Sequence, residues 1–270
     1  MQKGFEKMER ISDVFSFNFN HVDLPVTRIK KSEVQILNEL PGNLVGYNCL
    51  QCRNKGIVYY FTPSGETVYK PCDCMPKRAA YTRLEKSGLK GLADRYTLET
   101  FKTDQPFQKL IFNRAVEWIK HLSSSCFFIS GQSGAGKSHI CTAIVNKLIE
   151  FGYDAAYLQW REDSTYLKAN INEDIYSKKM SEYKKVDVLY IDDLFKSQKG
   201  KLPTAADINI AFELLNSRYV QNGKYTIIST ELFLNDIISF DEAVGGRLKE
   251  MAGNFVLQIA RENGRNYRLR

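Results

Sequence analysis

The stretch "ISGQSGAGKSHI", residues 129–140, decides the fold expected for this chain. It contains a glycine, four further residues and then Gly-Lys-Ser, which is the pattern of a phosphate-binding loop. The apolar run "CFFIS" precedes the loop, and the helical pattern "SHICTAIVNKLIEFG" follows it. This is the strand–loop–helix context that such a loop needs.

Glycines let the backbone of this loop turn tightly, so that consecutive N–H groups and the positive end of the next helix face a phosphate. We therefore predict that the site binds ATP or ADP. Lys137 would contact the β- and γ-phosphates, and the Ser138 hydroxyl would bind Mg²⁺. The loop alone leaves open whether the nucleotide supplies energy, a phosphoryl group or a signal. The predicted nucleotide-binding residues of the loop are Gly131, Gln132, Ser133, Gly134, Ala135, Gly136, Lys137 and Ser138.

Short apolar runs alternate with helix-length segments from about residue 92 onward. The runs are "CFFIS", "AAYLQ", "VDVLYID", "YTIIST" and "FVLQI". Alternation of strands and helices is typical of a parallel sheet covered by helices. The sequence therefore predicts an α/β fold of the phosphate-loop NTPase kind.

Two carboxylates end the third apolar run, in "VDVLYIDDLF" at residues 186–195. In a parallel sheet this strand end lies near the phosphate loop, so Asp192 could hold Mg²⁺. Asp193 could then orient or deprotonate an attacking water. A phosphotransferase has less need of this second acid, so the pair favours hydrolysis. The alternative is a strand-to-turn junction with two solvated acids.

Polar residues also end the run "YTIISTEL", residues 225–232. Thr230 could contact the γ-phosphate there, or it could cap the helix expected over "ELFLNDII". Arg247 lies in the helical pattern "DEAVGGRLKEM". Taken alone, it is typical of a solvated surface residue.

Four cysteines lie before the α/β region, as "CLQC" and "CDC". Cys49, Cys52, Cys72 and Cys74 are enough for a tetrahedral zinc site, and "GIVYYFT" and "TVYK" between the pairs predict a hairpin that would bring them together. We predict bound Zn²⁺; four free thiols are the alternative. Cys126 and Cys141 are expected to be small core residues.

The motifs, taken in order, resemble those of bacterial replicative helicase loaders of the DnaC and DnaI type, which are AAA+ ATPases close to the IstB transposition helpers. The resemblance runs from about residue 91 onward and is carried by "LADRYTLETF", "GQSGAGKSHI", "VLYIDDLF", "ADINIAFELLNSRY", "TIISTEL" and "GGRLKEM". It implies that Arg247 is an arginine finger that reaches the ATP of a neighbouring subunit, so that the chain self-associates through its ATPase domain. Glu231 departs from the family, in which many members carry Asn. Arg265 or Arg268 could be a second sensor arginine; the alternative is that both belong to a basic, solvated tail.

The expected organisation is a zinc-binding, helicase-docking domain at residues 1–76, a linker at 77–104 and an AAA+ ATPase domain at 105–270. No apolar run approaches the roughly 20 residues of a membrane span, and the first residues lack the apolar core of a signal peptide. We expect a cytoplasmic protein without membrane contact. The net charge of +7 permits a nucleic-acid partner. The basic segment 177–185, with Tyr176 and Tyr183, could contact single-stranded DNA or be a solvated amphipathic helix.

The expected function is ATP-dependent loading of the hexameric replicative helicase onto single-stranded DNA, during replication initiation or primosome assembly. Alternatives are an IstB-like transposition helper, a phosphotransferase and a nucleotide switch of low turnover. The sequence leaves open whether such a loader belongs to the host chromosome or to a phage or mobile element.

Overall fold

The computed structural model describes residues 26–86, 89–197, 201–262 and 265–266. The chain divides into two compact units, residues 1–78 and 79–270. Among the helices in the described ranges, none has the length and apolar character needed to cross a membrane.

A five-stranded sheet forms the middle layer of the second unit. All its strands pair in parallel, in the order β4-β5-β6-β3-β7. The strands are β3 (Cys126–Gly131), β4 (Ala155–Gln159), β5 (Val188–Asp192), β6 (Tyr225–Thr230) and β7 (Val256–Ile259). Helices cover both faces, which is why these strands are continuous apolar runs rather than alternating ones. The predicted α/β fold and its five strands are confirmed.

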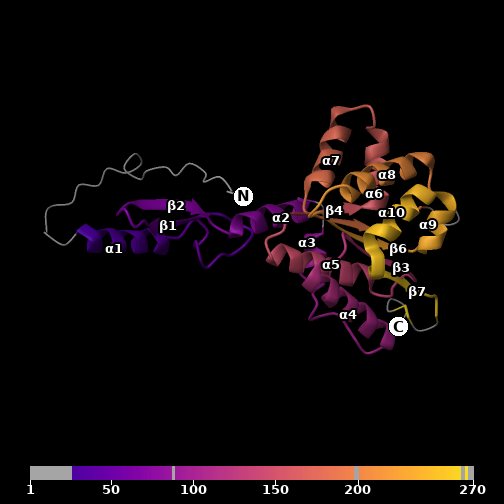
Figure 1. Cartoon of the computed structure of the whole chain (residues 1–270), viewed down its shortest axis with the longest axis horizontal. Coiled ribbons are helices and arrows are strands. Elements are labelled where there is room, and N and C mark those ends of the chain that lie inside the picture. The colour runs from indigo at the N-terminus through magenta and orange to yellow at the C-terminus, as the bar shows by residue number, and fades with distance from the viewer. Residues whose placement is uncertain (1–25, 87–88, 198–200, 263–264, 267–270) are drawn as a thin grey trace. The chain divides into compact units, whose positions relative to one another are not determined.

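The helices lie in two layers on opposite faces of the sheet (Figure 1). One layer contains α3 (Lys90–Ala93), α4 (Pro106–His121) and α5 (Lys137–Glu150). The other contains α6 (Trp160–Ala169), α7 (Asp174–Lys185), α8 (Ala205–Tyr219), α9 (Leu234–Phe240) and α10 (Glu242–Ala252). The predicted helix that carries Arg247 is therefore α10.

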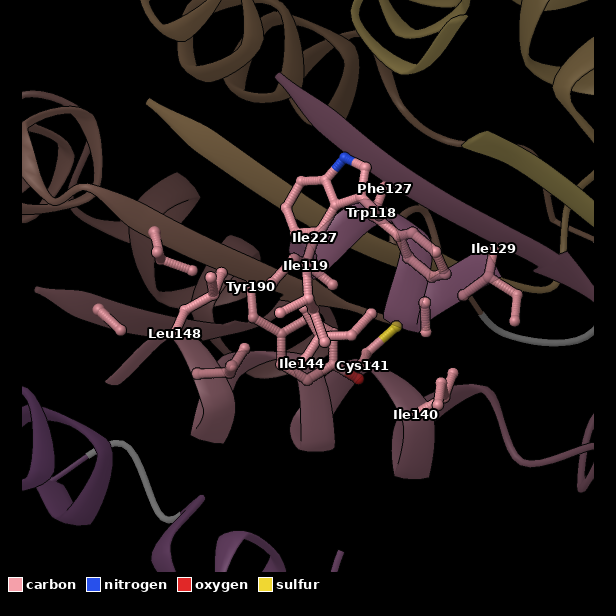
Figure 2. Close-up of a cluster of buried hydrophobic side chains, with 14 of the residues drawn as sticks. Trp118, Ile119, Phe127, Ile129, Ile140, Cys141, Ile144, Leu148, Tyr190 and Ile227 are labelled. Atoms are coloured by element: carbon pink, nitrogen blue, oxygen red, sulfur yellow. The ribbon is translucent and has the colours of Figure 1, made fainter. Parts of the chain in front are cut away.

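Large apolar side chains fill the space between the sheet and the α4–α5 layer. Figure 2 shows Trp118 of α4 beside Phe127 of β3, with Ile140 and Ile144 of α5 below them. Cys141 lies in this cluster, and Cys126 lies on the opposite face of the sheet. Both thiols are fully buried, and burial raises the pKa of each. The two cysteines are neutral core residues, as the sequence predicts.

The segment before α4 also belongs to this core. Leu84, at the end of α2 (Cys74–Lys86), is buried in the cluster, as are Leu89 and Phe101. Much of the segment assigned to a linker thus contributes apolar side chains to the second unit. The division into a docking domain, a linker and an ATPase domain stays a prediction.

The first unit contains α1 (Val26–Glu39) and a hairpin of β1 (Ile57–Phe61) and β2 (Thr67–Pro71), which pair in antiparallel fashion. The hairpin expected from the sequence is confirmed. Asn38 of α1 holds the helix to the edge of the hairpin: its side chain donates to the Tyr59 carbonyl at 2.9 Å and accepts from the Tyr59 N–H at 3.0 Å.

Candidate functional site

The phosphate loop joins β3 directly to α5. Gly131, Gly134 and Gly136 all have positive φ angles, of 109°, 75° and 93°. A side chain on Gly131 would begin only 2.0 Å from the Ile259 carbonyl oxygen, so no larger residue fits there. The helix α5 begins at Lys137, directly after the loop. The free N–H groups at its N-terminus favour an anion at this point.

Lys137 is a buried cation held by neutral acceptors. It is only 6 % exposed, and its ammonium donates to the carbonyls of Gly131 at 2.8 Å and Gln132 at 2.9 Å. Burial lowers its pKa, although the charges of Glu231 and Asp193 oppose this shift. A phosphate oxygen would be a stronger partner for this ammonium than the two carbonyls.

Asp192 lies at the end of β5 and accepts hydrogen bonds from four hydroxyls. The donors are Ser138 at 3.1 Å, Tyr157 at 3.1 Å, Tyr190 at 2.7 Å and Ser229. Burial raises the pKa of both tyrosines, so they remain donors. The Ser138 hydroxyl and the Asp192 carboxylate thus meet where the sequence predicts Mg²⁺, and oxygen ligands of this kind fit that ion.

Asp193 faces a different environment from that of its neighbour. It has a left-handed φ of 56°, and its N–H donates to the Ser229 hydroxyl at 3.1 Å. Its carboxylate accepts from the Lys196 ammonium at 2.8 Å. Lys196 also donates to Glu231 at 3.2 Å. Neither Lys196 as a site residue nor this ion triad was predicted from the sequence.

These groups surround a cavity of about 310 Å³. Three parts of the chain line it: the segment that leads into α4, the phosphate loop with the start of α5, and the ends of β5 and β6. The lining residues are Tyr96, Thr100, Phe101, Lys102, Gln108, Ser133, Gly134, Ala135, Gly136, Lys137, Ser138, His139, Asp193, Lys196 and Glu231.

The first of these parts forms an aromatic wall that was not predicted from the sequence. His139 stacks on Tyr96 with ring centroids 4.6 Å apart and meets Phe101 edge-on at 5.2 Å. Its Nε2 donates to the Thr97 carbonyl at 3.1 Å, and burial lowers its pKa. The aromatic residues of "LADRYTLETF" were the available signal, but nothing local pairs them with α5.

Thr230 does not reach this cavity. It is fully buried, its hydroxyl donates to the Leu194 carbonyl at 2.7 Å, and it accepts from the Leu232 N–H at 3.1 Å. The alternative that Thr230 caps the next helix is wrong. That helix, α9, begins only at Leu234, where the Asp236 side chain accepts from the N–H of Phe233.

Arg247 lies outside the cavity of its own chain. Its Nε donates to the Asn216 side chain at 2.9 Å and its Nη1 to the Ala243 carbonyl at 3.0 Å. The guanidinium lies 4.5 Å from the centre of the Phe212 ring. Contacts from α8 and α10 therefore hold it in place.

The last described residues lie against the phosphate loop. A side chain on Gly134 would begin 2.0 Å from the Asn266 side-chain oxygen. Arg265 pairs with Glu262 and donates to the Ala260 carbonyl at 3.0 Å. Arg268, the other candidate for a second sensor, lies outside the described residues.

One tyrosine considered for DNA stacking is unavailable. Tyr183 is 1 % exposed and packs in the core with Met180. The Tyr176 hydroxyl donates to Glu213 at 2.6 Å. The helix α7 is therefore amphipathic, and the stacking interpretation is wrong for Tyr183.

The four N-terminal cysteines form one buried cluster. Their sulfur atoms all lie within 4.8 Å of one another, with Cys49 and Cys72 3.8 Å apart and Cys52 and Cys74 3.6 Å apart. A tetrahedron with zinc–sulfur bonds of about 2.3 Å has edges of about 3.8 Å. The cluster therefore fits a tetrahedral metal ion.

A buried arginine joins the two halves of this cluster. The Arg78 Nε donates to the Cys74 sulfur at 3.4 Å, and its Nη2 donates to the Asn54 side chain at 2.6 Å. The same Asn54 oxygen accepts from the Cys49 N–H at 2.9 Å. The positive charge of Arg78 thus lies beside sulfur atoms that carry negative charge when they bind a metal.

Comparison with known proteins decides the family. The model of the IstB-like ATP binding protein family matches residues 77–245. This chain belongs to that family. Among its relatives in Bacillus subtilis, the phage-like element PBSX protein XkdC is 31 % identical over 224 residues, which cover 79 % of this chain and 82 % of that protein. The uncharacterized protein YqaM is 32 % identical over 205 residues, and the match spans 64 % of its length.

Solved structures share the fold. The match to DnaI has a TM-score of 0.51 at 15 % identity and covers 66 % of this chain and 93 % of that one. The match to the DnaC helicase loader has a TM-score of 0.50 at 18 % identity and covers 63 % and 98 %. The match to the replication initiator DnaA bound to AMPPCP and single-stranded DNA has a TM-score of 0.52 at 23 % identity. It covers 63 % of this chain and 51 % of that one. With this fold and family membership, the chain is an ATPase of the AAA+ type.

Proposed function

We propose that this chain loads a hexameric replicative helicase onto single-stranded DNA and uses ATP hydrolysis to time the release. The observation that carries the proposal is the presence, in one chain, of a hydrolytic nucleotide site and a separate cluster of four cysteines. The AAA+ unit would supply a nucleotide-dependent assembly, and the cysteine unit would supply a docking surface. The relative named for a phage-like element supports a loader of the phage kind.

The chemistry assigned to the nucleotide site is attack of a water on ATP. The water oxygen forms a bond to the γ-phosphorus. At the same time the bond from the γ-phosphorus to the bridging oxygen breaks, and this oxygen keeps the electron pair and leaves as part of ADP. Asp193 orients this water and accepts its proton. Lys137 would bind the β- and γ-phosphates, and Ser138 and Asp192 would hold Mg²⁺, which would neutralise phosphate charge.

Arg247 is the proposed contribution of one subunit to the next. Its guanidinium is positioned on α10 by Asn216 and lies outside the cavity of its own chain. An arginine that stabilises transition-state charge from a neighbouring subunit would make hydrolysis depend on assembly. We propose self-association of the ATPase domain on this basis.

The cysteine unit is the proposed helicase-docking domain, residues 1–76, with Zn²⁺ held by Cys49, Cys52, Cys72 and Cys74. A unit of this size has little core of its own, and a structural metal would stabilise it. Its proposed task is binding rather than catalysis. Residues 77–104 would connect it to the ATPase domain at 105–270.

A transposition helper is the second candidate, because the matching family model is IstB-like. Its partners would be a transposase and double-stranded DNA. The cysteine cluster favours the loader, since it lies in the unit before the segment that the family model covers. A phosphotransferase would need an acceptor in place of water, and measured phosphate release separates it from both.

The test uses the full chain, the hexameric helicase of the source cell and circular single-stranded DNA. We expect ATP-dependent transfer of helicase onto the circles. Lys137→Ala should abolish transfer, and a Cys49→Ser/Cys52→Ser variant should hydrolyse ATP but fail to capture the helicase. Capture of helicase by the cysteine variant at wild-type level would contradict the docking role. Recovery of a transposase instead of the helicase would favour the second candidate.

A further inference from the structure

Lys196 is the one residue of the ion triad that carries positive charge. It lies in the segment after β5, and its ammonium contacts Asp193 at 2.8 Å and Glu231 at 3.2 Å. All three side chains line the nucleotide cavity with Lys137. They are about one-third exposed, so Lys196 has room to change partners.

Without Lys196, the side of the cavity that carries Asp193 and Glu231 would repel a triphosphate. Asp193 and Glu231 would then present two carboxylates to the end of the cavity where Lys137 would hold the γ-phosphate. These carboxylates would repel the negative γ-phosphate, most strongly where water is partly excluded. Lys196 neutralises one of the two charges, and its flexible stem lets the ammonium reach a nearby phosphate oxygen.

The residues that could otherwise contact the γ-phosphate from β6 are already engaged. The Ser229 hydroxyl donates to Asp192, and the Thr230 hydroxyl donates to the Leu194 carbonyl. Both residues are fully buried, and neither is among the cavity-lining residues in the part of the chain that the structure describes. Glu231 follows them and points its carboxylate at Lys196 rather than offering a donor.

We propose that Lys196 is a catalytic residue that reads the γ-phosphate. When ATP is bound, the Lys196 ammonium leaves Asp193 and donates to a γ-phosphate oxygen. This exchange frees Asp193 to accept the proton of the attacking water. Glu231 keeps Lys196 within reach of both partners. With ADP there is no γ-phosphate, so Lys196 stays on Asp193. The inference rests on the ATPase activity and holds whether or not the chain loads a helicase.

The deciding measurement is the ratio of ATP to ADP affinity, determined by calorimetry on the full chain. Lys196→Gln should weaken ATP binding by roughly 10- to 100-fold, which is the effect expected for one lost charge-assisted hydrogen bond. ADP binding should change less than about threefold, because ADP lacks the γ-phosphate. The turnover number should fall, and Lys196→Arg, which keeps the charge, should retain part of the ATP preference.

Lys168→Ala is the matched control. Lys168 has a similar exposed fraction, 30 % against 34 %, and pairs with Asp207 at 2.6 Å, but it lies outside the nucleotide cavity. Losing that pair should affect stability without changing the ATP to ADP ratio. A Lys196→Gln variant with the wild-type ratio and wild-type turnover would overturn the proposal and leave the triad a structural ion pair.

Discussion

Asp192 and Asp193 are neighbours in the chain, yet their surroundings assign them different chemistry. Asp192 accepts from hydroxyl donors and is 9 % exposed, whereas Asp193 lines the cavity beside Lys196. A carboxylate held by donors suits a metal ligand, and one that borders the cavity suits a base. At the scale of single residues the two acids are therefore not interchangeable.

Asp193→Asn should bind ATP with near wild-type affinity and hydrolyse it at least about 100-fold more slowly, because a general base is lost while the metal ligand stays. Asp192→Asn should instead weaken the Mg²⁺ dependence of nucleotide binding. Single-turnover phosphate release and Mg²⁺ titrations check the two. Wild-type turnover in Asp193→Asn would rule out its role as the base.

If the cysteine cluster holds one Zn²⁺ per chain as proposed, Arg78→Gln should lower its zinc affinity by about 10- to 100-fold without changing this stoichiometry, as losses around metal ligands do. The reason is the lost contact to Cys74 and the loosened Asn54 bridge. Competition with a chelator measures the affinity. Lys77→Gln removes a charge from the same helix and is the control. Equal losses in both variants would show that only net charge matters.

Helix α8 depends on a capping box at its first turn. The Asp207 N–H donates to the Thr204 hydroxyl at 3.2 Å, and the Thr204 N–H donates to the Asp207 carboxylate at 2.9 Å. Lys168 of α6 adds a contact to the same carboxylate at 2.6 Å. This arrangement joins two elements of the same layer, so its loss should be felt beyond one helix end.

Asp207→Asn should destabilise the chain by about 1 kcal/mol at neutral pH, as lost caps do. Burial opposes ionisation of Asp207, but the hydrogen bonds from Lys168 and Thr204 outweigh it and lower its pKa. Because the pKa of Asp207 is lower in the folded chain, its ionised carboxylate stabilises the fold at pH values above its pKa in the unfolded chain, about 4. This contribution is lost as the pH falls through the pKa of Asp207 in the folded chain. Urea unfolding should therefore show a wild-type advantage that narrows below about pH 4. A constant difference at all pH values would contradict the argument.

For the whole molecule, the order of the sheet decides what the site contains. The strand β6 lies between β5 and β3, so the ends of all three open onto one cavity with the phosphate loop. Arg247 is held on α10, away from that cavity. If Arg247 is the arginine finger proposed above, we expect the catalytic set to be complete only when a second copy of the chain supplies this arginine.

Mixing Arg247→Ala with Lys137→Ala should therefore restore part of the ATPase activity that each variant lacks alone. One interface in the mixture then joins an intact phosphate loop to an intact arginine. Steady-state phosphate release against mixing ratio, at concentrations that permit assembly, checks this. A mixture that stays inactive while it assembles would mean that Arg247 has a structural role.

The features that were predictable from the sequence depend on residues that lie close together in the chain. The phosphate loop needs three glycines and a lysine within a few positions, and each buried strand is recognisable in the sequence as an apolar run. The cysteine pairs were visible for the same reason, since a hairpin returns the chain from Cys52 to Cys72. The sequence by itself thus determined the fold class, the five strands, the nucleotide loop and the cysteine cluster.

Only the tertiary structure decided how distant side chains share the site. Lys196 meets Glu231 across 35 positions, and His139 meets Thr97 across 42. Arg218, fully buried, donates to five acceptors around the starts of β5 and β6, although its sequence context is that of a surface helix. These contacts follow from which strands are neighbours and which helix faces are covered. Local propensity and residue spacing do not predict which strands become neighbours, because the order of the strands is set by the packing of the whole sheet.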